Sequence, residues 1–224
     1  MADATYIEPL TVNYLKKIIE IEQPDAVLPT LGGQTALNLS MELENENVFD
    51  KNDILLLGAS AKSIEIAENR WLFKSAMESA GIKTLQAEYV KSIEEGVAAS
   101  EDIGFPLMLR PSFILGGGGT SLVESKEDLE KKLKDAFKAS PTQEVLIEES
   151  VYGWKEYELE VMRDSDGNGV IVCGIENFDP MGVHTGDSIT VAPIQTLSDK
   201  EYQIMRDEAL LCLDTIGIAT GGSN

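Results

Sequence analysis

The chain has 224 residues, of which 43% are hydrophobic and 25% are charged, so it is long enough for one large domain or two small ones. Its 18 Lys and Arg residues stand against 39 Asp and Glu residues, which gives a net charge of −21. So negative a chain excludes nucleic acid and anionic membrane surfaces as partners bound through overall charge, and any phosphate must be held locally by arginines and backbone N–H groups.

Two cysteines, Cys173 and Cys212, lie among apolar residues, where buried free thiols are expected rather than a disulfide framework. The first residues form no basic, apolar leader, and no apolar run is long enough to span a bilayer. The sequence therefore predicts a cytoplasmic protein in a reducing compartment, with no membrane segment.

The first 60 residues alternate between helical and strand patterns. Apolar spacing predicts helices over 11–22 and 34–44, and short apolar runs predict strands over 26–29 and 54–57. This alternation predicts a parallel α/β layer. The turn at Gly32 and Gly33 suits either an anion at a helix N-terminus or a plain strand-to-helix connection.

The remaining elements follow in chain order and become richer in strands toward the end. Helices are expected over 60–67, 69–80, 92–103 and 199–216, and strands over 86–90, from 107, and over 144–147, 157–163 and 169–175, with a hairpin turn at 164–168 and a strand approach at 218–224. The alternation of lysines and acids over 124–138 is typical of a solvated helix face.

Between Leu107 and Thr120 an apolar strand runs into Arg110 and then into four glycines, Gly116 to Gly119. Glycines let successive backbone N–H groups turn toward an anion, and a guanidinium supplies a forked charge. This segment predicts a phosphate-binding loop, with a flexible hairpin tip as the alternative.

Acidic residues cluster around a second strand end. Glu148 and Glu149 close an apolar strand, and Glu156, Glu158 and Glu160 alternate with apolar residues, which places the last three on one face of a strand. A solvated face explains Glu158 and Glu160, and it explains the pair at 148–149 less well.

His184 is the only histidine and lies in a polar, glycine-spaced segment, 175–193. No second His or Cys is near it in the sequence to form a zinc site. A structural role and a ligand contact both remain open for this side chain.

Three of these segments together resemble the ATP-grasp enzymes, most closely the amino-terminal half of carbamoyl-phosphate synthetase large subunits, over essentially the whole chain. The resemblance rests on Arg110-Pro-Ser-Phe with the glycines that follow, on 152–164 (Tyr-Gly-Trp-Lys-Glu-Tyr-Glu-Leu-Glu-Val-Met-Arg-Asp), and on 176–193, from Glu-Asn-Phe-Asp-Pro to Thr-Val-Ala-Pro. It implies an α/β and α+β fold. A partial pre-ATP-grasp α/β domain would cover 1–60, and an ATP-grasp domain that lacks the end of its second lobe would cover 61–224, with a small lobe over about 85–150.

The resemblance also implies roles for individual residues. Arg70 and Arg110 would reach the phosphates of ATP, the backbone at Glu149 and Val151 would border adenine, and Glu156 would accept hydrogen bonds from the ribose. The loop at Gly116 and Gly117 would close over the phosphates, and the remaining wall would consist of Gly182, Val183 and His184. Arg110 and His184 are the residues that this likeness places nearest the chemistry.

The implied reaction is phosphoryl transfer from ATP to bicarbonate, giving carboxyphosphate, which ammonia from a glutaminase small subunit attacks on the way to carbamoyl phosphate for pyrimidine and arginine synthesis. The Mg²⁺ or Mn²⁺ ligands of such enzymes would follow Asn224, so no metal ligand and no activity of this chain alone are expected. The alternatives are another ATP-grasp ligase of the biotin-carboxylase kind and a non-catalytic nucleotide-binding or subunit-interaction module.

Overall fold

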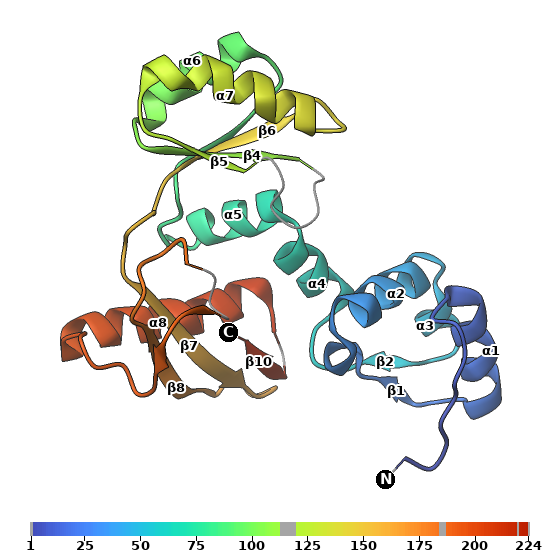
Figure 1. The fold of residues 1–224 in the computed structure, drawn as a ribbon. Coiled ribbons are helices and arrows are strands. Elements are labelled where there is room, and N and C mark those ends of the chain that lie inside the picture. The colour runs from blue at the N-terminus through green and yellow to red at the C-terminus, as the bar shows by residue number, and fades with distance from the viewer. Residues whose placement is uncertain (1, 113–119, 184–186, 219, 224) are drawn as a thin grey trace. The chain divides into compact units, whose positions relative to one another are not determined.

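The structure is a computed structural model that describes every residue except 1, 113–119, 184–186, 219 and 224 (Figure 1). Its contacts divide the chain into two compact units. The first consists of Met1–Ile82, Tyr157–Glu176 and Thr190–Asn224, and the second of Lys83–Glu156 and Asn177–Ile189. These units are defined by contacts and do not test the expected domain boundary at residue 60, which stays a prediction.

The amino-terminal part of the first unit is a small α/β layer. Strands β1 (Ala26–Val27) and β2 (Leu55–Leu56) pair in parallel, as the alternating pattern predicts. Buried apolar residues hold the helices against them, namely Ile19, Leu43, Val48, Phe49 and Ile54. The helices of this part are α1 (Val12–Glu22), α2 (Gly33–Asn45), α3 (Val48–Lys51), α4 (Ala61–Glu68) and α5 (Arg70–Ser79).

The strand expected over 26–29 is shorter than predicted. It ends at Val27, and Pro29 begins a 3-10 helix, η1 (Pro29–Gly32). Proline has no backbone N–H for a strand ladder, and its fixed φ suits the first turn of a helix. The short helix α3 is not visible in the periodicity, because four residues give too few repeats.

The carboxyl-terminal part of the first unit is a four-stranded sheet with a long helix. The strand order is β10-β7-β8-β9, and β10 pairs antiparallel with β7, so the predicted strand approach near 218–224 is confirmed over Gly221–Ser223. Helix α8 (Asp199–Ile216) begins at a capping box formed by Ser198 and Glu201. The strands are β7 (Glu156–Arg163), β8 (Gly169–Asn177), β9 (Thr190–Val191) and β10 (Gly221–Ser223).

The second unit is an α+β layer with an antiparallel sheet. Its strand order is β3-β6-β4-β5, and Figure 1 shows α6 and α7 on the same side of this sheet. The elements are β3 (Ala87–Val90), α6 (Ile93–Ile103), β4 (Leu107–Pro111), β5 (Ser121–Val123), α7 (Lys126–Ala139) and β6 (Val145–Glu149).

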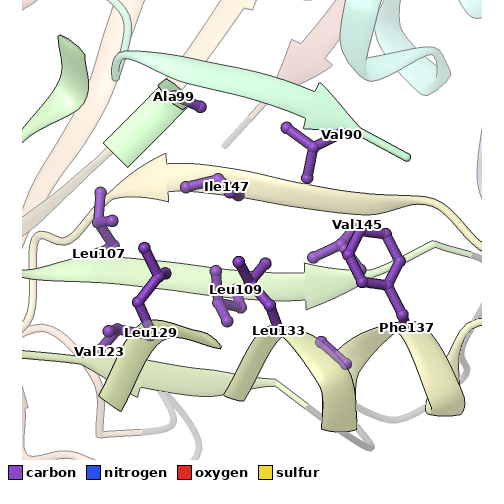
Figure 2. Close-up of a cluster of buried hydrophobic side chains, with 11 residues drawn as sticks. Val90, Ala99, Leu107, Leu109, Val123, Leu129, Leu133, Phe137, Val145 and Ile147 are labelled. Atoms are coloured by element: carbon purple, nitrogen blue, oxygen red, sulfur yellow. The ribbon is translucent and has the colours of Figure 1, made fainter. Parts of the chain in front are cut away.

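Its core forms where apolar residues of α7, spaced at helical intervals, meet inward-facing strand residues. Helix α7 has its charged residues on the other side, as the alternation of lysines and acids predicts. Gly96 of α6 lets that helix approach α7, because a Cβ there would lie 2.6 Å from Leu133 Cδ1. Figure 2 shows this core, in which the labelled residues are Val90, Ala99, Leu107, Leu109, Val123, Leu129, Leu133, Phe137, Val145 and Ile147.

The strand expected over 144–147 is observed as β6 (Val145–Glu149), which ends two residues later than predicted. Glu148 pairs with Ala87 and with Met108, and Glu149 pairs with Leu107, so both acids belong to β6. Sheet pairing on both sides extends the strand beyond the apolar run that marks it in the sequence. Among the described residues, no helix is both long enough and apolar enough to cross a membrane.

Candidate functional site in the second unit

Arg110 stands on β4, just before the glycine segment. Leu107 and Leu109 on the same strand are fully buried, whereas the side chain of Arg110 is 46% exposed, because successive strand residues face opposite sides of the sheet. Its Nε donates to Oε1 of Glu148 on β6. Arg110, the predicted phosphate ligand, thus lies on the face of the sheet away from the buried core, with its guanidinium hydrogen-bonded to an acid.

The backbone at 149–151 leaves β6 and forms a short turn. The Glu149 N–H donates to the Gln86 carbonyl at 2.8 Å, and the Ser150 N–H donates to the Pro106 carbonyl at 3.1 Å, so both groups are held by neighbouring strands. The Val151 carbonyl accepts from the Trp154 N–H at 3.0 Å. Within the described residues the Val151 N–H makes no hydrogen bond, which leaves it available to the edge of a planar heterocycle.

The segment around 181–183 is held by two backbone hydrogen bonds to the residues that follow this turn, 153 and 154. The Gly153 N–H donates to the Met181 carbonyl at 3.0 Å, and the Met181 N–H donates to the Trp154 carbonyl at 2.7 Å. Gly182 has φ +110°, and a Cβ there would lie 2.6 Å from the ring of Tyr152. A glycine is therefore required at 182 both for its backbone conformation and for the approach of the tyrosine.

The structure brings Arg110, Glu149, Val151, Gly182 and Val183 into one unit. Val183 is 39% exposed, and its N–H donates to the Pro180 carbonyl at 3.3 Å.

Two other predicted residues are placed at element boundaries. Glu156 begins β7 and is half-buried, as are Glu158 and Glu160, so the solvated-face interpretation of this strand stays a prediction. Arg70 is exposed at the first position of α5 and belongs to the first unit, where Asn69 Oδ1 caps the helix by accepting from the N–H groups of Trp71 and Leu72.

Gly116, Gly117 and His184 lie outside the described residues. The closing of the glycine loop over phosphates and the choice between a structural and a ligand-contacting His184 stay predictions.

Sequence reasoning missed Glu148 as the partner of Arg110 and Tyr152 as the partner of Gly182. Both contacts join segments about 30 or more residues apart, and they depend on strand register and turn geometry. The unusual acidic pair at the end of an apolar strand is the one signal in the sequence that pointed toward Glu148.

Elsewhere the described residues hold fewer candidates for chemistry. No three His, Cys, Asp or Glu side chains of the described residues come together as a metal site would require. A cavity of about 690 Å³ in the first unit is lined by residues of the segment before α1, of α1 and α2, and of the stretch that joins these helices, and none of the predicted site residues is among them. Cys173 and Cys212 are free and half-buried rather than buried, and burial raises the pKa of the Cys212 thiol.

Two stretches of the sequence match known families. Residues 69–224 match the family described as the ATP-binding domain of the carbamoyl-phosphate synthase L chain, and residues 1–66 match the carbamoyl phosphate synthase preATP-grasp domain.

Curated relatives match over the whole chain. It is 56% identical to the carbamoyl phosphate synthase large chain, N-terminal section, of Aquifex aeolicus, with 100% of this chain and 40% of that protein covered. The large chains of Thermotoga petrophila and Pasteurella multocida are 56% and 54% identical over 100% of this chain, which spans 20% and 21% of their lengths.

Solved structures show the likeness of fold. A biotin carboxylase from Campylobacter jejuni has a TM-score of 0.73 at 22% identity, over 95% of this chain and 47% of that one. The biotin carboxylase domain of the Hydrogenobacter thermophilus 2-oxoglutarate carboxylase has a TM-score of 0.70 at 20% identity, over 96% and 48%. The expected mixed α/β and α+β class, covering part of an ATP-grasp fold, is confirmed.

Proposed function

Because this chain belongs to the carbamoyl-phosphate synthase large-chain family, we propose that its second unit binds ATP and that it supplies part of the ATP site of an ATP-dependent ligase. The observation that carries the proposal is the gathering of Arg110, the 149–151 turn and the 182–183 segment in one compact unit. Forked donors and free strand-end backbone are the groups that a nucleotide requires.

The adenine ring would lie against the 149–151 turn. The Val151 N–H, which has no partner among the described residues, would donate to a ring nitrogen, while the two hydrogen bonds at Met181 hold Gly182 and Val183 beside the turn as an apolar wall. Glu156, where β7 begins, would accept from the ribose hydroxyls, since a carboxylate suits a vicinal diol.

The phosphates would meet Arg110, and Arg70, Gly116, Gly117 and His184 complete the proposed set. Arginine forms paired, charge-assisted hydrogen bonds with phosphate oxygens, so the local guanidinium overcomes the repulsion that a chain of net charge −21 exerts on a polyanion. In phosphoryl transfer the protein acts mainly by positioning and by neutralising charge.

The described residues do not fit a magnesium site. Mg²⁺ takes oxygen ligands in near-octahedral geometry, and no three acidic or other ligating side chains of the described residues come together. None of the described residues is therefore proposed as a ligand of Mg²⁺ or Mn²⁺.

The complete reaction is proposed for that longer protein, because the chain spans 20–40% of the relatives' lengths. It would phosphorylate bicarbonate to carboxyphosphate in the cytoplasm and use ammonia from a glutaminase small subunit to form carbamoyl phosphate. A biotin-carboxylase-like function is less well supported, since identity to the carboxylase structures is 22% or less in the comparisons above, against 54–56% to the synthase large chains.

Isothermal titration of the purified 224-residue chain with ATP, with and without Mg²⁺, tests the proposal. We expect weak binding that does not need the metal and that Arg110→Ala reduces, because the arginine contacts phosphate. No binding under either condition would favour an interaction module. The same preparation should release no ADP in response to bicarbonate, and release above the Arg110→Ala control would contradict this expectation.

A further inference from the structure

Glu148 and Arg110 form a diagonal pair on the face of the second unit's sheet that points away from the core and from α6 and α7 (Figure 1). Glu148 lies opposite Met108 in the β6–β4 ladder, and Arg110 lies opposite Leu146, so the two are offset by one pair of residues on the same face. A long arginine side chain spans that diagonal, and its Nε donates to Glu148 Oε1. The contact is therefore fixed by the register of two central strands.

This pair differs from an ordinary surface ion pair in its burial. The side chain of Glu148 is 14% exposed, whereas that of Arg110 is 46% exposed. A carboxylate held in the sheet is a fixed acceptor, and a charge-assisted hydrogen bond to it orders the mobile arginine. The more buried residue of the pair, Glu148, therefore restricts the conformation of the more exposed one, Arg110.

The hydrogen bond to Glu148, which engages Nε, leaves the two terminal amino groups of the Arg110 guanidinium without a partner among the described residues. These terminal groups are the donors that form paired hydrogen bonds with a phosphate. Glu148 therefore holds the guanidinium through Nε and leaves the two terminal amino groups available to a phosphate.

We propose that Glu148 is a positioning residue that aims Arg110 at the nucleotide phosphates, an inference that rests on the ATP-binding function proposed above. It acts through the arginine and does not touch the nucleotide. Electrostatics alone predicts the opposite effect of its removal, because loss of a negative charge near a polyanion strengthens binding. The two explanations therefore differ in sign.

The test is titration of the 224-residue chain with ATP and, separately, with adenosine. Glu148→Ala is expected to weaken ATP binding about tenfold and to change adenosine binding less than about twofold, as for the loss of a coupled contact to the phosphates. In an Arg110→Ala background the same substitution is expected to have no further effect. ¹⁵N NMR should show faster exchange of the Arg110 Nε–H in Glu148→Ala than in the wild-type chain, because the hydrogen bond to Glu148 is lost.

Glu88→Ala is the control for net charge, because Glu88 is exposed on the neighbouring strand β3 opposite Ile147, on the other face of the sheet from Arg110, and its removal changes the net charge equally. It should leave ATP binding unchanged or slightly tighter. If Glu148→Ala does not fold, Glu148→Gln keeps an oxygen acceptor without the charge and should show a smaller loss for ATP alone. Unchanged or tighter ATP binding, or an equal loss for adenosine, overturns the positioning role. Absence of ATP binding to the wild-type chain instead overturns the proposed function itself.

Discussion

At Gly182 the backbone has φ +110°, a conformation that residues with a side chain rarely adopt. A Cβ at this position would lie 2.6 Å from Tyr152 Cδ2. Gly182→Ala should therefore lower the free energy of unfolding by about 1–3 kcal/mol and weaken nucleotide binding, because the 181–183 segment would move away from the 149–151 turn. Urea denaturation and ATP titration measure the two effects.

Gly153→Ala separates backbone strain from the collision. Gly153 also has a positive φ, +85°, but nothing lies within 4 Å of the position of its Cβ. We expect a loss of stability at 153 from strain alone, and a larger one at 182 from strain and the displaced ring together. Equal losses would show that the contact with Tyr152 contributes nothing.

At the scale of elements, the hairpin between β7 and β8 depends on one carboxylate. Asp164 Oδ2 accepts from the Asn168 side-chain amide at 2.8 Å, and Oδ1 accepts from the Asn168 and Asp166 N–H groups at 2.8 and 3.0 Å. These hydrogen bonds, the Asn168 side-chain amide first, lower the pKa of the Asp164 carboxyl.

The sign of the pH dependence follows from that lowered pKa. The turn's contribution to stability is complete above the unfolded-state pKa of an aspartate, about 3.9, and is lost as the pH falls through the lower pKa of the folded state. Asn168→Ala should raise the Asp164 pKa toward its ordinary value, as NMR titration of the carboxyl carbon can measure. Ser165→Ala, in the same turn, should leave the Asp164 pKa unchanged, and a similar rise there would contradict the assignment.

At the scale of the whole molecule, the two units have separate cores. Leu133 is fully buried in the core of the second unit, and Leu43 is 3% exposed in that of the first. Leu133→Ala should cost about 2–5 kcal/mol in the second unit and Leu43→Ala a similar amount in the first, because each leaves a cavity.

Hydrogen exchange read by mass spectrometry distinguishes these losses. Leu133→Ala should speed exchange in 87–149 and spare 12–56, and Leu43→Ala should do the reverse. Acceleration throughout the chain by either variant would mean that the units unfold together.

Much of this protein follows from patterns that are local in its sequence. The amphipathic pattern of α8, the alternation of lysines and acids in α7 and the helix–strand alternation that leads to the β1–β2 pair predict these elements, because a side chain's direction repeats with the period of the backbone. The strand that runs through Arg110 toward the glycines indicates a phosphate ligand, since few other arrangements combine a forked charge with so permissive a backbone.

Tertiary structure alone decided which partners those residues have. The register of β4 against β6 places Glu148 diagonally across from Arg110 on the same face of the sheet, where the two form a hydrogen bond. Two backbone hydrogen bonds of Met181 place Gly182 next to the ring of Tyr152. A shift of one residue in the β4–β6 register would place the Glu148 or the Arg110 side chain on the opposite face of the sheet. Register depends on the summed packing of whole strands rather than on any one residue. The sequence by itself thus determined most of the elements and the residue types that suggest a nucleotide ligand, while the fold determined which of those residues contact one another.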